Sequence, residues 1–123
     1  MMDLDGFKQI NDRYSHAVGD AVLVAIAGTL RRLLRVTDLI GRYGGDEFVV
    51  LLPSSSLPTA AAVLDRAVSQ VSALPHDQAR GVTVSVGVTA VGQTDSAHTA
   101  LARADEAMYA AKRLGGARVV AAR

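Results

Sequence analysis

The chain has 123 residues, half of them hydrophobic, which predicts one domain with a substantial core. Its 13 basic and 12 acidic residues leave a net charge of +1, so no long-range attraction to nucleic acid or membrane is expected. The lack of cysteine excludes disulfides and thiolate metal sites, and the lack of tryptophan argues against base-stacking surfaces. With no apolar run long enough to span a bilayer and no secretory leader, we expect a cytoplasmic domain.

Hydrophobic spacing divides the chain into elements in the order (β)-α-α-β-β-α-β-α-β. In chain order these are the end of a strand at Met1–Leu4, helices Phe7–Tyr14 and Val18–Leu33, strands Leu39–Tyr43 and Asp46–Leu52, a helix from Pro58 to Val71, a polar break at Pro75–Gly81, a strand Val82–Ala90, a helix Ala97–Leu114 and a strand Arg118–Ala122. One hairpin combined with helical crossovers predicts an α/β chain with a mixed sheet and helices packed on it.

The predicted hairpin carries the stretch RYGGDEFVVLL, from Arg42 to Leu52. A Gly-Gly pair between two apolar runs is a hairpin signal, and glycine allows a ligand to approach the backbone closely. Asp46 and Glu47 follow at once, and they point to opposite faces if both belong to the strand. Taken alone, the pattern fits either a site at the tip or a turn with two solvated acids.

Asp3 and Asp5 alternate at the end of the first apolar run, just before Gly6. A calcium-binding EF-hand loop starting at Asp3 would need an acid or amide at Phe7 and a glutamate at Tyr14, so that interpretation fails. A haloacid-dehalogenase phosphatase would need a threonine in place of Phe7 and a longer chain. The remaining interpretations are a metal pair formed by Asp3 and Asp46 across neighbouring strands, or simple strand-end acids.

Two further groups could recognise a nucleotide. Asn11 and Asp20 together match the hydrogen-bonding edge of guanine, although either also suits a helix end. His16 lies between them and on its own is typical of a surface histidine. The chain has no Walker A loop, so phosphates would depend on the backbone around Gly6 and on cations such as Lys8 and Lys112.

Five separated stretches closely resemble the GGDEF domain of bacterial diguanylate cyclases over nearly the whole chain. They are Asp3–Asp12, Gly19-Asp20, Arg42–Phe48, Thr83–Gly87 and Ala104–Lys112. The resemblance implies a cyclase or palm fold, a central sheet surrounded by helices, with the Gly-Gly-Asp-Glu-Phe motif on a β-hairpin. It also implies the reaction: two domains, each loaded with GTP and Mg²⁺ or Mn²⁺, meet as a homodimer and form cyclic di-GMP and two pyrophosphates.

The resemblance also implies roles for individual residues. Asp3, the Leu4 carbonyl and Asp46 would be the metal ligands, Asp46 would also accept a proton, Glu47 would assist a second metal, and Lys8 would stabilise charge on the phosphates. The implied nucleotide contacts are Asn11 and Asp20 to guanine, His16, Gly44 and Gly45 along the nucleotide, and Lys112 to the terminal phosphates.

A second implied site binds the product. Arg35 and Asp38 stand before the hairpin at the spacing of the family's inhibitory site, and Arg66 falls where the family often adds another arginine. Guanidinium groups suit phosphates or the acceptor edge of guanine, and a carboxylate suits the guanine donors.

The chain departs from the family pattern in two places. It begins almost at Asp3, so we expect residues 1–123 to be a single GGDEF domain lacking the usual N-terminal helix and part of the first strand, from a protein with an N-terminal sensor domain. Gly116 stands where the family usually has an arginine, with Arg118 two positions later. The alternative hypothesis is therefore a catalytically weak or inactive module that binds cyclic di-GMP.

Overall fold

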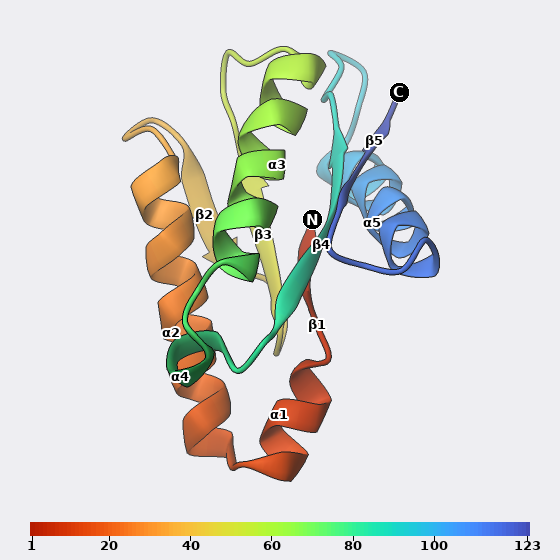
Figure 1. The fold of residues 1–123 in the computed structure, drawn as a ribbon. Helices are drawn as coiled ribbons and strands as arrows, with labels where there is room; N and C mark the ends of the chain where they lie inside the picture. The colour runs from red at the N-terminus through yellow and green to blue at the C-terminus, as the bar shows by residue number, and fades with distance from the viewer.

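A five-stranded mixed sheet runs through the centre of the computed structural model, which describes residues 1–123 (Figure 1). The strands are β1 (Met2–Asp5), β2 (Leu39–Arg42), β3 (Glu47–Leu51), β4 (Thr83–Thr89) and β5 (Val119–Ala122), in the spatial order β2-β3-β1-β4-β5. Neighbours are antiparallel except β4 and β5, which are parallel. The predicted mixed sheet is confirmed, and β1 with its two aspartates lies at its centre.

Helices cover both faces of this sheet. They are α1 (Phe7–Arg13), α2 (His16–Leu33), α3 (Leu57–Ser72), α4 (His76–Ala79) and α5 (Ala97–Arg113). Helices α3 and α5 lie on opposite sides of β4, while α1 and α2 form a corner at the lower end of the sheet (Figure 1). Serine side chains cap the starts of α2, α3 and α5 by accepting backbone N–H groups.

Strand β4 shows how the sequence assigns the two faces. Val84, Val86 and Val88 join the main core with α2 and α3, whereas the alternate residues Ser85 and Gly87 face α5. A Cβ at Gly87 would overlap the α5 backbone, so this glycine lets helix and strand approach closely. The period of two predicted the strand, but the structure covers both of its faces, one carrying the valines and the other Ser85 and Gly87.

The structure differs from the predicted elements in three details. The polar break contains the short helix α4, and α2 begins at His16, directly after the capping Ser15. The strands of the hairpin end at Arg42 and begin again at Glu47, so Asp46 lies in the turn. Asp46 and Glu47 therefore do not both belong to the strand. The hairpin prediction had allowed both in one strand with side chains on opposite faces, and that arrangement is not formed.

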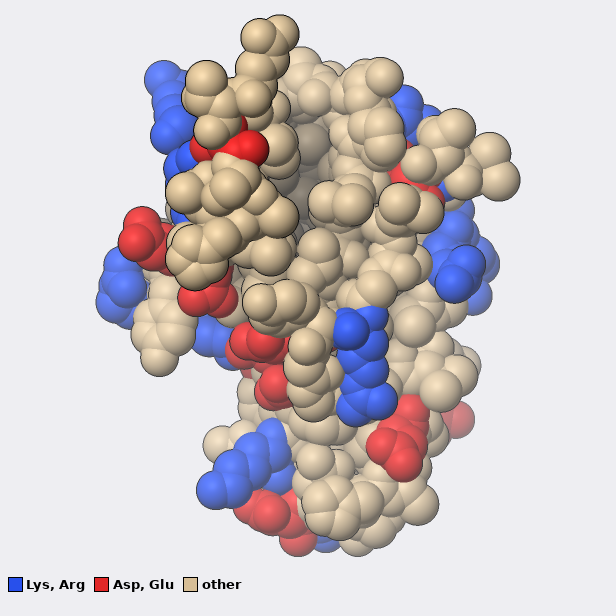
Figure 2. Space-filling model, turned by 180° about the vertical axis from the view of Figure 1, so that it is seen from behind, with Lys and Arg blue, Asp and Glu red and all other residues tan.

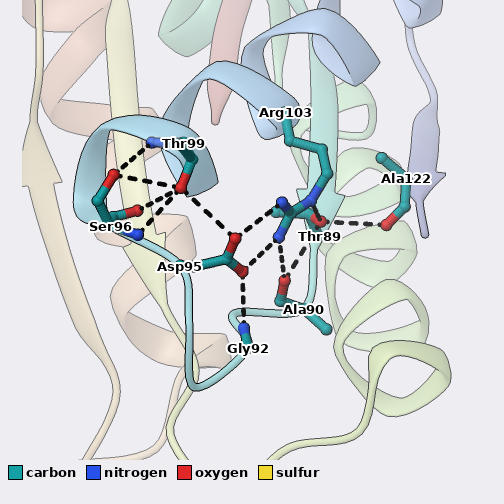
Figure 3. A network of polar contacts seen from close by, with 8 residues as sticks. All are labelled: Thr89, Ala90, Gly92, Asp95, Ser96, Thr99, Arg103 and Ala122. Carbon is teal, nitrogen blue, oxygen red and sulfur yellow. Dashed lines mark hydrogen bonds and ion pairs between the residues drawn. The ribbon is translucent and has the colours of Figure 1, made fainter.

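A polar network fastens the start of α5 to the end of β4 (Figure 3). The Arg103 guanidinium donates to both carboxylate oxygens of Asp95, to the Thr89 hydroxyl at 2.7 Å and to the Ala90 carbonyl at 2.6 Å. The hydrogen bonds from Arg103 hold the pKa of Asp95 well below its usual range. Because α5 also carries Lys112 at its far end, this network helps to fix the helix that reaches the site.

An apolar groove of about 750 Å³ opens at the end of the sheet away from Asp5, between β3 and β4. Met1 and Met2 lie in it, and residues of α3 and α5 form its walls. Figure 2 shows the hollow near the top of the rear face, walled mainly by uncharged side chains. None of the helices has the combination of length and apolar character needed to cross a bilayer.

Candidate active site

Asp3 and Asp46 come together because β1 pairs with β3 beside the hairpin turn. Asp3 is the register partner of Glu47, and the Leu4 backbone N–H donates to the Asp46 carbonyl at 3.1 Å. Burial raises the pKa of Asp3 to about 6, the charge of Asp46 adds to this effect, and Lys112 opposes it. The Asp3 Oδ1 atom is buried and has no hydrogen-bond partner within the chain.

This arrangement fits a small divalent cation. A buried carboxylate oxygen without a donor, close to a second carboxylate, is costly in a metal-free chain and is satisfied by a hard cation. Only two carboxylates contribute, because residues 1–123 contain no cluster of three or more metal-ligating side chains. Mg²⁺ suits such a site, since it commonly takes one or two carboxylates and completes its shell with water and substrate phosphates.

Arg42 braces the turn that carries Asp46. Its guanidinium donates to the Gly44 carbonyl at 3.2 Å and to the Gly45 carbonyl at 2.6 Å, while the Tyr43 N–H donates to the Glu47 carbonyl at 2.8 Å. These bonds hold the four-residue turn in one shape and leave Gly45 exposed. Sequence analysis did not single out Arg42, although a long cation two positions before a glycine pair was a signal for it.

Asp5 lies two residues further along β1 and is not part of the Asp3–Asp46 carboxylate pair. Its Oδ1 accepts from the Ser85 hydroxyl at 2.7 Å, and its Oδ2 accepts from the Thr83 hydroxyl at 2.8 Å and the Ala117 N–H at 3.1 Å. Although burial opposes them, these bonds and the charge of Lys112 lower the pKa of Asp5. Asp5 therefore joins β1, β4 and the turn before β5, a role that Thr83 and Ser85 share and that sequence analysis missed.

Lys112 extends from the last turn of α5 toward both aspartates of β1. Its ammonium lies 3.0 Å from Asp3 Oδ2 and 3.3 Å from Asp5 Oδ1, and these partners raise the pKa of Lys112 against the effect of burial. The lysine predicted to reach phosphates therefore lies beside Asp3 and pairs with carboxylates in this structure.

Asn11 reaches α2 where that helix has a glycine. A Cβ at Gly19 would overlap Asn11 Oδ1, so the absence of a side chain makes room for the amide. Asn11 Oδ1 is buried without a hydrogen-bond partner, and Asp20 follows Gly19 with an exposed side chain. The corner between α1 and α2 thus brings together the pair expected to contact guanine.

Lys8 and His16 are exposed, on α1 and at the first residue of α2. The turn at Gly116 shows why a larger residue is disfavoured there: its φ is 74° and a Cβ would lie 3.0 Å from Asp5 Oδ2. Arg118 folds back on this turn, since its Nε donates to the Gly116 carbonyl at 3.0 Å. Arg118 is therefore engaged with the turn.

Arg35 and Asp38 form a separate cluster between α2 and β2. The Arg35 guanidinium donates to Asp38 at 3.0 Å, to the Pro53 carbonyl at 2.8 Å and to the Ser55 hydroxyl at 2.9 Å. The hydrogen bonds from Arg35 lower the pKa of Asp38. Arg66 is exposed on α3 and has no ion-pair partner in the chain.

Comparison with known proteins places these residues in context. The family model described as "Diguanylate cyclase, GGDEF domain" matches residues 1–118. The chain is 43% identical to diguanylate cyclase DgcP of Pseudomonas aeruginosa over an alignment of 118 positions that covers 94% of this chain and 18% of that protein. It is 42% identical to the response regulator PleD of Caulobacter vibrioides over an alignment of 126 positions that covers 98% of this chain and 28% of PleD. The chain thus spans less than a third of either relative.

Solved structures agree with this match. The GGDEF domain of DgcB from Caulobacter crescentus, in complex with c-di-GMP, aligns with a TM-score of 0.90 and 32% identity, covering 98% of this chain and 74% of that one. Diguanylate cyclase SiaD of Pseudomonas aeruginosa, in complex with its activator SiaC, aligns with a TM-score of 0.91 and 43% identity, covering 98% of this chain and 48% of that one. The fold expected from the five stretches is therefore confirmed.

Proposed function

Because the chain belongs to the GGDEF-domain family of diguanylate cyclases, we propose that it condenses two molecules of GTP into cyclic di-GMP and two pyrophosphates. One observation carries the proposal: Asp3 has a buried oxygen without a partner beside the Asp46 carboxylate, which is the donor set that a catalytic divalent cation needs.

We assign Mg²⁺ or Mn²⁺ to Asp3, the Leu4 carbonyl and Asp46, with Glu47 available to a second ion. When bound, the metal neutralises charge on the phosphates of GTP. Gly44 and Gly45 admit the nucleotide to the hairpin, and the braces from Arg42 keep that turn rigid. Positioning and charge neutralisation are the main demands of phosphoryl transfer, so a rigid turn at this place suits the reaction.

The corner of α1 and α2 selects the base. Asn11 and Asp20 can pair with the amide edge of guanine, whereas adenine would leave the Asp20 carboxylate without a donor. His16 lines the same corner, and Lys8 and Lys112 bind the phosphates.

In the reaction, the 3′-hydroxyl of one GTP attacks the α-phosphorus of the other. The new bond joins the 3′-oxygen to phosphorus, the bond to the bridging oxygen of pyrophosphate breaks, and Asp46 takes the proton from the hydroxyl. Two such transfers close the ring and release two pyrophosphates. Because each domain holds one GTP, two copies of the domain must face one another.

We further propose that cyclic di-GMP inhibits the enzyme at Arg35, Asp38 and Arg66. The carboxylate of Asp38 is already held in place by Arg35, so the guanine donors of the product would meet a fixed acceptor. Arg35 and the exposed Arg66 offer guanidinium groups for the product's phosphates or for the acceptor edge of guanine. The pairing of Arg35 with Asp38, Pro53 and Ser55 preorganises this surface.

One observation favours a second function. Gly116 offers no side chain to phosphates, and the Nε of Arg118 donates to the Gly116 carbonyl within the turn. A module that binds cyclic di-GMP and turns over GTP slowly would have these features. Because DgcP and PleD are each more than three times as long as this chain, we also propose that the domain is joined to an N-terminal sensor domain. We propose the cytoplasm as the place where this domain works.

Two substitutions separate these functions. Asp46→Ala should reduce the formation of cyclic di-GMP by about a hundredfold or more, with the binding of cyclic di-GMP unchanged by calorimetry. Arg35→Ala should weaken product binding and leave or raise turnover. Asp77→Ala and Arg31→Ala, which remove the same charges from exposed positions, serve as controls. Unchanged turnover in Asp46→Ala would contradict the catalytic assignment, and unchanged product binding in Arg35→Ala would contradict the inhibitory site.

A further inference from the structure

The Lys112 ammonium lies against the same Asp3 carboxylate that a cation would bind, on its second oxygen. It lies 3.0 Å from Asp3 Oδ2 and 3.3 Å from Asp5 Oδ1, with about a third of its side chain exposed to solvent (29%). An ammonium so close to two partly buried carboxylates neutralises part of their charge in the absence of a metal. Lys112, on Oδ2, and a divalent cation, on the unpartnered Oδ1, therefore compete for the charge of the same carboxylate.

The two aspartates hold Lys112 in different ways. Asp5 is fixed, because both of its oxygens accept hydrogen bonds from Thr83, Ser85 and the Ala117 N–H in addition to Lys112. Asp3 has no comparable set of donors. Its Oδ1 has no partner, and Lys112 is the only ion-pair partner of its Oδ2. When a cation binds Asp3, the lysine loses one partner and keeps the other.

We infer that Lys112 is the resident counter-ion of Asp3 and that Asp5 is the positioning residue that retains Lys112 at the site when a divalent cation displaces it. This inference deepens the proposed function and rests on it. A cation at Asp3 repels the ammonium, and the phosphates of the arriving nucleotide give the ammonium a new partner. The cation drives the ammonium away from Asp3, and the phosphates hold the ammonium in its new position. Cation and nucleotide should therefore bind cooperatively.

The first test measures the binding of Mn²⁺ to the nucleotide-free chain by paramagnetic resonance, at mildly alkaline pH so that protons do not compete. Lys112→Met should bind Mn²⁺ about tenfold more tightly than the parent chain. Lys112→Arg, which keeps the charge, should restore weak binding, and Arg113→Met, which removes an exposed neighbouring charge, should match the parent. Equal or weaker Mn²⁺ binding by Lys112→Met would overturn the inference.

The second test addresses Asp5 through the same signal, measured with and without a non-hydrolysable GTP analogue. In the parent chain the analogue should tighten Mn²⁺ binding about tenfold or more, and Asp5→Asn should lose most of that gain. Asp12→Asn, which removes an exposed carboxylate from α1, is the control. If Asp5→Asn fails to fold, Asp5→Glu, which keeps the charge but moves it, should also reduce the gain. A gain as large as the parent's in a folded Asp5 variant would overturn the role of Asp5.

These tests remain informative if the chain makes no cyclic di-GMP, because neither requires turnover. If Mn²⁺ does not bind the parent chain even with the analogue, the proposed metal site itself is wrong. If Mn²⁺ binds normally but without the effect of Lys112, only the further inference fails.

Discussion

At the scale of single residues, the site depends on polar atoms that are buried before any ligand arrives. Asp3 Oδ1 and Asn11 Oδ1 are both buried and without partners, and they lie in the two places where a cation and a guanine are proposed to bind. Buried polar atoms without partners are rare because they cost free energy, so these two oxygens mark places where a ligand could supply the missing contact.

The raised pKa of Asp3 predicts the pH dependence of cation binding. The cation needs the ionised carboxylate, and the pKa of Asp3 is about 6, so Mn²⁺ affinity should rise steeply between pH about 5 and about 7 and then level off. The folded chain holds this proton more tightly than the unfolded chain, so the stability that Asp3 contributes in acid is lost as pH rises from about 4 to about 6. Mn²⁺ titrations between pH about 5 and about 7 check the predicted rise in Mn²⁺ affinity. An affinity already constant below pH about 5 would contradict it.

Gly19→Ala should weaken GTP binding without unfolding the chain. The new methyl group would overlap Asn11 Oδ1, and the flexible amide would have to leave its position. We expect the affinity for a GTP analogue to fall about tenfold, measured by calorimetry. Gly28→Ala on the same helix is the control, because its Cβ would meet only Arg32 Nη1 at 3.5 Å and should add roughly 1 kcal/mol to stability. Equal GTP affinity in Gly19→Ala and the parent would contradict the placement of Asn11 in the base site.

At the scale of elements, the contact between α5 and β4 positions Lys112 over β1. Gly87 allows this contact because the backbone of α5, at Ala104 and Met108, occupies the space of a side chain there. The network of Arg103 and Asp95 then fastens the start of the same helix (Figure 3). The position of Lys112 is therefore a consequence of how a whole helix packs.

Gly87→Ala should destabilise the fold severely, by about 3 kcal/mol or more, because backbone rather than a flexible side chain would have to move. Urea unfolding followed by circular dichroism measures the change. Gly41→Ala on the edge strand β2 has open space around its Cβ and should be neutral or slightly stabilising. Similar unfolding midpoints for both variants would show that α5 can shift away from β4 at little cost.

Most elements could be predicted from the sequence because their patterns are local. The alternation from Val82 to Ala90 and the helical spacing from Val18 to Leu33 both correspond to observed elements. The position of Asp46 in the turn could not be predicted, because it depends on the bonds of Arg42 to two carbonyls. The short helix α4 was missed because four residues are too few to show a period.

At the scale of the whole molecule, the candidate site is assembled from both ends of the chain. Asp3 stands near the start, Asp46 in the first half and Lys112 near the end, and the order of strands brings them together. Sequence motifs identified all three residues, but the pairing of Lys112 with the aspartates required the structure. The hydrogen bonds that Asp5 accepts could not be predicted either, because its partners lie about eighty and more than a hundred positions away along the chain.

The proposed reaction needs two copies of the domain, so its rate should depend on association. Turnover per domain should rise with protein concentration across about a hundredfold range and level off once the pairs are complete. Measuring cyclic di-GMP formation at several concentrations, with GTP in excess, checks this. A constant turnover per domain over that range, in a sample shown to be monomeric by light scattering, would contradict catalysis between two domains.

The central claim is that this chain converts GTP to cyclic di-GMP at the cation site of Asp3 and Asp46. The most direct measurement incubates the purified chain with GTP and Mg²⁺ and identifies the products by chromatography and mass spectrometry. The account predicts cyclic di-GMP and two pyrophosphates for each pair of GTP consumed, and no such product from Asp46→Ala. Unconsumed GTP in a folded, paired sample freed of bound cyclic di-GMP would contradict the claim.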